Sequence, residues 1–266
     1  MRTTVSFLVA VCLLALPAVA QISPQAARTY DGVGLDQHLG ERVPPDLVFR
    51  NEEGQRIELG TYMDGSRPVL LTFVYHTCPM LCSALLDGLT RTLEDVDFVP
   101  GESFELVTVS FSERDTPEMA AQQKEKYLRR LAQREADWHF LTGDSAAIAE
   151  LTARVGFRFR WVEEQQEFVH PAALVFLGGD GTITRYLSDL APRSRDVRAA
   201  LVEASEGSIG TLLDQAFLYC FQYDPTRNSY VLSARRAMKI GGLLTLAALL
   251  ATLCMLWRRE LRTVSA

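Results

Sequence analysis

The stretch FVYHTCPMLCSALLDGL, residues 73–89, joins a predicted buried strand to a predicted helix. The strand is RPVLLTFVY, residues 67–75, a short and nearly continuous apolar run that is typical of a central strand buried on both faces. The helix is predicted over residues 79–96, because leucines recur there at helical spacing, at Leu81, Leu85, Leu86, Leu89 and Leu93. Cys78 and Cys82 therefore lie where the strand turns into the helix.

Strands and helices alternate on both sides of this stretch, and the pattern predicts one α/β domain over residues 43–215. FELVTVSF and DWHFLTG predict two more central strands, FRFRWVEE and EFVHPAALVFLGGDGTITRYL supply further strands, and helices are predicted over residues 117–134, 144–156 and 192–205. Strand, CxxxC, helix, strand, helix, strand is the order of a thioredoxin-like core. Ahead of this core, DLVFRNEEGQRIELG alternates apolar and polar residues around Glu53-Gly54, which predicts an added N-terminal β-hairpin.

Both ends of the chain carry apolar segments. Residues 1–20 have one positive residue, an apolar run and a final Ala-Val-Ala, as in a secretory signal peptide, although an uncleaved anchor has the same features. Residues 240–257 carry no charge over a length that nearly spans a hydrocarbon core of ~30 Å, so a transmembrane helix is favoured over a buried core helix. We therefore expect a lead-in over residues 21–42, a juxtamembrane segment over residues 216–239 and a cytoplasmic tail over residues 258–266.

The exported N-terminus orients the chain, because the basic clusters on the two sides of the C-terminal helix are balanced. The domain is predicted to face the periplasm from the inner membrane. The formal net charge of −6 and the lack of a basic block in the soluble part argue against nucleic acid as a partner.

The CxxxC pair allows three interpretations, namely a redox disulfide, a pair of metal ligands, or two buried thiols without chemistry. Cysteines at i and i+4 share one face of a helix, and at the turn into the helix they come within disulfide reach. A helix N-terminus stabilises the thiolate that both active roles require. Cys254 is expected to be inert within lipid, and for Cys220 a buried free thiol is favoured over an intermolecular disulfide or a transient copper contact.

A histidine decides between the two active roles, because two soft thiolates with an imidazole suit Cu(I). His170 opens the strand HPAALVFL, and Pro171 occupies the position of the cis-proline loop that a thioredoxin-like fold places beside its active-site helix. His170 is thus the best third ligand to join Cys78 and Cys82. His76 is expected to support the site from outside rather than to bind metal; His38 lies in the lead-in, and His139 is expected to be structural.

Taken together, these residues resemble the Sco/SenC family of membrane-anchored, thioredoxin-like copper proteins. The resemblance covers VPPDLVFRNEEGQRIEL, PVLLTFVYHTCPMLC, ELVTVSFSERDTP and HPAALVFLGGDGTITRYL, in the family's order. It implies that Cys78, Cys82 and His170 bind copper, as Cu(I) or Cu(II). It also implies delivery to the copper-site subunit of cytochrome c oxidase, with a thiol reductase role on that subunit's cysteines.

Three features depart from the family pattern. Ser112-Glu113 stands where many members have Asp-Pro, so an Asp expected at the Cu(II) site is missing; Asp115 is kept and is expected to cap the next helix. The predicted anchor is C-terminal rather than N-terminal. Pro171 follows the histidine where a small hydroxyl residue is common.

Two functions remain open at the level of sequence. The first is a copper metallochaperone, and the second is a thiol-disulfide oxidoreductase with Cys78 as the nucleophile and Cys82 as the resolving thiol. Whether the chain is an enzyme is therefore left open. A peroxidase of similar fold would need its own motif around an activated cysteine, and the sequence shows none.

Overall fold

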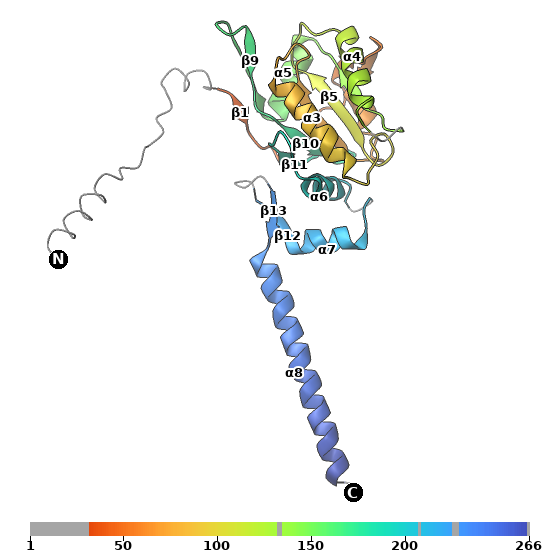
Figure 1. The fold of residues 1–266 in the computed structure, drawn as a ribbon, viewed down its shortest axis with the longest axis vertical. Coiled ribbons are helices and arrows are strands. Elements are labelled where there is room, and N and C mark those ends of the chain that lie inside the picture. The colour runs from red at the N-terminus through yellow and green to blue at the C-terminus, as the bar shows by residue number, and fades with distance from the viewer. Residues whose placement is uncertain (1–31, 132–134, 207–208, 225–228, 265–266) are drawn as a thin grey trace, which may run out of the picture.

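The computed structural model describes residues 32–131, 135–206, 209–224 and 229–264 (Figure 1). The predicted signal peptide and residues 21–31 of the predicted lead-in lie outside these residues. The fold is α/β, with helices packed on a mixed sheet, as predicted. Its five-stranded sheet has the order β11-β10-β4-β5-β6, with bounds β4 Val69–Val74, β5 Glu105–Ser110, β6 His139–Leu141, β10 Leu174–Leu177 and β11 Ile183–Leu187.

The two strands at the middle of the sheet, β4 and β5, are buried along their whole length. β4 pairs in parallel with β5 and antiparallel with β10. All six residues of β4 and all six of β5 are buried, and the sequence of β4, VLLTFV, is nearly continuously apolar, as is typical of a strand buried on both faces. β4 therefore carries the chain out of the core directly into the CxxxC turn.

Among the described residues, the α-helices of this domain are α3 Leu81–Glu94, α4 Pro117–Leu128, α5 Ser145–Arg154 and α6 Ser194–Ala204. α3 contacts both α4 and α6, and α6 packs on β4, β10 and β11. The side chains of Thr116 and Asp144 cap α4 and α5 by accepting hydrogen bonds from backbone N–H groups of the first turn.

Some boundaries differ from those predicted. α3 begins at Leu81, so Pro79 precedes the helix instead of lying in its first turn. α4 ends at Leu128, six residues earlier than predicted, and Leu131, just beyond its end, is buried in the hydrophobic core. Every described peptide bond is trans, including the bond between His170 and Pro171.

Short strands surround the central sheet. β2 Val48–Arg50 pairs antiparallel with β3 Arg56–Glu58, and a 3-10 helix, η1 Leu59–Tyr62, follows. β1 Gly34–Leu35 pairs with β7 Phe157–Arg158, and β8 Arg160–Val162 pairs with β9 Glu167–Val169. The β8–β9 hairpin ends one residue before His170 and so sets where that side chain enters the core.

The C-terminal part forms a separate layer between α6 and a long helix (Figure 1). It consists of α7 Leu212–Cys220 and a hairpin of β12 Phe221–Asp224 with β13 Ser229–Leu232. α8, Ala234–Val264, then leaves the domain, and its segment Met238–Met255 is long and apolar enough to cross a membrane and contains no buried residue. The predicted transmembrane segment lies within α8.

Candidate metal centre

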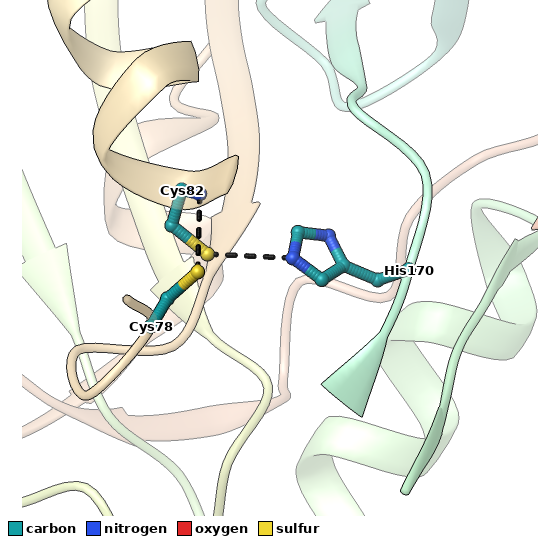
Figure 2. Close-up of side chains that lie close together, drawn as sticks. All are labelled: Cys78, Cys82 and His170. Atoms are coloured by element: carbon teal, nitrogen blue, oxygen red, sulfur yellow. Dashed lines mark hydrogen bonds between the residues drawn. The ribbon is translucent and has the colours of Figure 1, made fainter. Parts of the chain in front are cut away.

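Cys78, Cys82 and His170 come from two places in the chain and meet beyond the carboxyl end of β4, the central strand of the sheet. Cys78 lies in the turn after β4, Cys82 lies in the first turn of α3, and His170 lies in the loop between β9 and β10. Figure 2 shows the imidazole pointing from its loop toward the two sulfur atoms. Cys82 and His170 are 3% and 6% exposed, whereas Cys78 is half-buried and gives the site its contact with solvent.

The three side chains hold their donor atoms close together. One donor atom from each residue lies within 4.8 Å of the other two. The Sγ of Cys82 is 3.4 Å from the Nε2 of His170 (Figure 2). The Nδ1 of His170 is 3.0 Å from the carbonyl oxygen of Pro171. Because a carbonyl oxygen only accepts, Nδ1 carries the proton, and the Nε2 lone pair faces the sulfur atoms.

Backbone groups fix both sulfur atoms. The N–H of Cys82 donates to the Sγ of Cys78 over 3.2 Å, and the N–H of Tyr75 donates to the Sγ of Cys82 over 3.4 Å. Both donors are held by regular structure, since Tyr75 follows β4 and Cys82 belongs to α3. The sulfur atoms are therefore placed before any ligand arrives.

The two thiols are electrostatically different. The side chain of Cys82 hydrogen-bonds to Cys78 and lowers the pKa of the Cys78 thiol, with help from the backbone at Cys82 and Met80. Burial raises the pKa of the Cys82 thiol, and the nearby Cys78 raises it further. The pair thus shares one negative charge, carried on Cys78, the more exposed sulfur.

Aromatic rings hold the imidazole of His170. The ring centroids of Phe111, Tyr75 and Phe157 lie 4.9, 5.9 and 6.1 Å from that of His170. Phe168, two residues before His170, packs against Phe111 with a centroid distance of 5.5 Å. These contacts exclude water from the inner side of the site and leave the imidazole little freedom to turn away.

Asp115 does not cap α4, although its position before the helix predicted that it would. Its Oδ2 accepts from the backbone N–H of His76 and from the hydroxyl of Ser110, each over 2.6 Å, and Thr116 caps α4 in its place. Asp115 therefore ties the turn that leads to Cys78 to the end of β5. The sequence did contain a signal for this contact. Asp115 follows a buried strand, and the ends of neighbouring parallel strands lie side by side, here the ends of β5 and β4.

The other histidines and cysteines whose side chains the structure describes do not join the centre. His139 lies at the start of β6 with its Nε2 3.4 Å from Asp137 and 3.7 Å from Glu105, and the Nδ1 of His38 is 2.9 Å from the carbonyl oxygen of Arg154. His76 is largely buried, which lowers the pKa of its imidazole, and no described residue makes a hydrogen bond to its ring nitrogens. Cys254 is exposed on α8. The side chain of Cys220 lies outside the described structure.

Comparison with known proteins identifies the family. The family model described as SCO1/SenC matches residues 37–205. The chain belongs to the SCO1/SenC family. No curated protein gives a significant match.

Solved structures share the fold of this SCO1/SenC protein. A putative electron transfer protein from Aquifex aeolicus is 22% identical, with a TM-score of 0.56, over 64% of this chain and 96% of that one. ScoI from Arabidopsis thaliana, solved with copper bound, is 16% identical, with a TM-score of 0.51, over 62% of this chain and 98% of that one. Both structures leave more than a third of this chain unmatched.

The donor set of this SCO1/SenC protein fits a soft metal ion. Two sulfur atoms and one imidazole nitrogen are the ligands that Cu(I) accepts at low coordination number, and Cys78, Cys82 and His170 supply them without a carboxylate. Sulfur positions set by the backbone and an imidazole held by aromatic rings mean that little rearrangement is needed to bring the three donors onto one ion.

Proposed function

We propose that this chain binds copper through Cys78, Cys82 and His170 and delivers it to the binuclear copper site of cytochrome c oxidase during assembly. The observation that carries the proposal is the convergence of the two sulfur atoms and the imidazole within 4.8 Å. Membership of the SCO1/SenC family supports it, as does the copper bound in the Arabidopsis ScoI structure of the same fold.

The different exposure of the three ligands gives the transfer a direction. Cys82 and His170 are buried, whereas Cys78 is half-buried and is followed by the exposed Pro79 and Met80. An incoming cysteine of the partner can therefore reach the copper from the Cys78 side. Stepwise ligand exchange then replaces Cys78 first, and the buried ligands hold the ion until the partner completes its own site.

Thiol-disulfide exchange is the second candidate function, and the lowered pKa of Cys78 favours it. The Cys78 thiolate would attack a partner disulfide, forming a mixed disulfide and releasing one partner thiolate. The Cys82 thiol would then lose its proton and attack Cys78, releasing the second partner thiolate. The partner gains two electrons, and Cys78 and Cys82 become a disulfide.

The arrangement in the membrane is part of the same proposal. The signal peptide, residues 1–20, would export the chain, and the helix at residues 240–257 would anchor it in the inner membrane with the domain of residues 43–215 in the periplasm. Residues 258–266 would remain in the cytoplasm. The copper site would then share a compartment with the copper-binding domain of an oxidase subunit.

The variant His170→Ala separates the two functions. Under the copper proposal, the affinity of the reduced protein for Cu(I), measured by competition with a chromophoric chelator, drops by about 10-fold or more, because a buried ligand is lost. Exchange with a test disulfide survives, because both thiols remain. His38→Ala, which removes a histidine outside the centre, is the matched control and leaves both properties unchanged. Full Cu(I) affinity in His170→Ala would show that the proposed ligand set is wrong.

A further inference from the structure

α7 and β13, which lie between the family domain and α8, expose large apolar side chains to solvent. Leu213 on α7 is 82% exposed, Tyr219 near the end of α7 is 55% exposed, and Leu232 at the end of β13 is 56% exposed. These residues belong to the part of the chain that lies beyond the family match. The copper chemistry makes no use of them.

The two faces of α7 differ in what they contact. Asp214 accepts two hydrogen bonds from Arg198 of α6, over 2.7 and 2.9 Å, and Phe217 and Leu218 pack against the hydrophobic core. These positions share one side of the helix at the spacing i, i+3, i+4. Leu213, Ala216 and Tyr219 are exposed and lie on other sides of the helix.

The two faces of α7 also differ in charge. Asp214 is the one charged residue in the sequence LLDQAFLYC of α7, and it is turned toward Arg198 on α6. Among the side chains of α7 that the structure describes, the exposed ones are Leu213, Gln215, Ala216 and Tyr219, and each of these is uncharged. Exposed apolar side chains that lie together on a protein surface mark a site that binds another protein or a membrane.

The direction of α8 identifies that partner. α7 contacts α6 and also contacts α8, and Figure 1 shows α7 lying across the direction of α8, with α6 on one side and the length of α8 on the other. When α8 spans a bilayer, the axis of α7 is close to the plane of that bilayer. The side of α7 that faces away from α6 then faces the lipid.

We propose that α7 and the end of β13 bind the surface of the phospholipid bilayer through Leu213, Ala216, Tyr219 and Leu232. Leucine side chains enter the boundary between headgroups and acyl chains, at a depth of about 5–10 Å, and the tyrosine lies at the headgroup level. The copper domain is thereby held to the membrane at a second place besides α8, which limits its tilt. The proposal rests on α8 being a membrane helix and is independent of copper binding.

Tryptophan scanning of the full-length protein in phosphatidylcholine nanodiscs tests the proposal. Leu213→Trp and Leu232→Trp are each introduced together with Trp257→Phe, which removes the tryptophan of α8. The control is Glu164→Trp in the same background, an exposed position in the turn before β9 at the end of the domain away from α8 (Figure 1). The probe is a phosphatidylcholine brominated near the top of its acyl chain, which quenches tryptophan on contact.

We expect the Leu213→Trp and Leu232→Trp variants to lose most of their added emission in brominated nanodiscs, and the Glu164→Trp variant to lose none of it. Quenching of the native Trp257, measured separately, reports that α8 is inserted. If Trp257 is quenched and the two leucine variants behave like the Glu164→Trp control, the surface does not bind lipid and the proposal is wrong. If the tryptophan of the Leu213→Trp variant is instead shielded from iodide in water and the protein is dimeric, a second copy covers the surface, which overturns the proposal equally.

Discussion

Cys78 and Cys82 are four residues apart and have opposite electrostatic environments. The backbone N–H and the side chain of Cys82 both point at the sulfur of Cys78, so the negative charge of the pair is stabilised there. Cys82 lies deeper, where burial disfavours a second thiolate. The more accessible sulfur atom is therefore ionised and the buried one carries a proton that metal binding must displace.

This asymmetry predicts how the reactivity of Cys78 depends on pH. Because its pKa is lowered, Cys78 in the reduced, metal-free protein stays a thiolate, and stays reactive, well below the ordinary cysteine pKa of about 8.5. Cys82→Ala removes the hydrogen bond that contributes most to this shift, so the alkylation profile of Cys78 moves to higher pH. Peptide-resolved alkylation rates measured across pH report the change.

Cys82→Ser is the matched control, because its hydroxyl can still donate to Cys78, and its profile should move less than that of Cys82→Ala. Identical profiles for the wild-type protein and Cys82→Ala would contradict the assignment of the shift to Cys82.

The residues of the centre were predictable to different degrees. Cys78 and Cys82 stand in a recognisable strand-to-helix turn, and His170 could be placed beside them because Pro171 marks the loop that this fold brings to the active-site helix. Asp115 could not be assigned, because sequence position does not say which way a side chain turns at a helix start. Its carboxylate does not cap α4 and instead accepts a hydrogen bond from the backbone N–H of His76.

At the scale of elements, α3 holds the sulfur atoms in place only if the helix itself is seated closely on the domain. A Cβ at Gly88 would lie 1.7 Å from the carbonyl oxygen of Leu190, so this glycine lets the backbone of the helix and that of the loop before α6 approach each other. The hydroxyl of Thr92 donates to the carbonyl oxygen of Pro192 over 2.7 Å and closes the same contact. No periodicity of the sequence signals this approach.

Gly88→Ala should therefore destabilise the domain, although alanine favours a helix by about 1 kcal/mol over glycine. The overpacking costs roughly 1–3 kcal/mol, since a backbone carbonyl cannot turn aside as a side chain can. Urea unfolding measures the change, and Arg91→Ala, at an exposed position of the same helix, is the control and should be nearly neutral. An unchanged or increased free energy of unfolding for Gly88→Ala would mean that the loop at Leu190 moves aside without destabilising the domain.

At the scale of the whole molecule, the metal centre joins two parts of the fold that are distant in sequence. Cys82 and His170 are 88 positions apart, one at the start of α3 and the other in the loop between β9 and β10. The sheet order was needed to bring them together, because β10 lies next to β4 and runs antiparallel to it. A metal ion bound by all three ligands would connect α3 to the loop between β9 and β10.

Copper should then stabilise the folded domain by an amount that depends on His170. A ligand that binds only the native state adds about 2.7 kcal/mol when its free concentration is a hundredfold above Kd. For a domain of this size that corresponds to a rise in Tm of roughly 5–10 °C.

Trp138, which is fully buried and donates to Thr108 over 2.8 Å, reports unfolding by fluorescence in the reduced protein with and without Cu(I). In His170→Ala the two cysteines come from adjacent turns of the chain and no longer connect α3 to the β9–β10 loop, so most of the rise should disappear. An equal rise in His170→Ala would show that copper is held by the CxxxC turn alone and does not close the site across the fold.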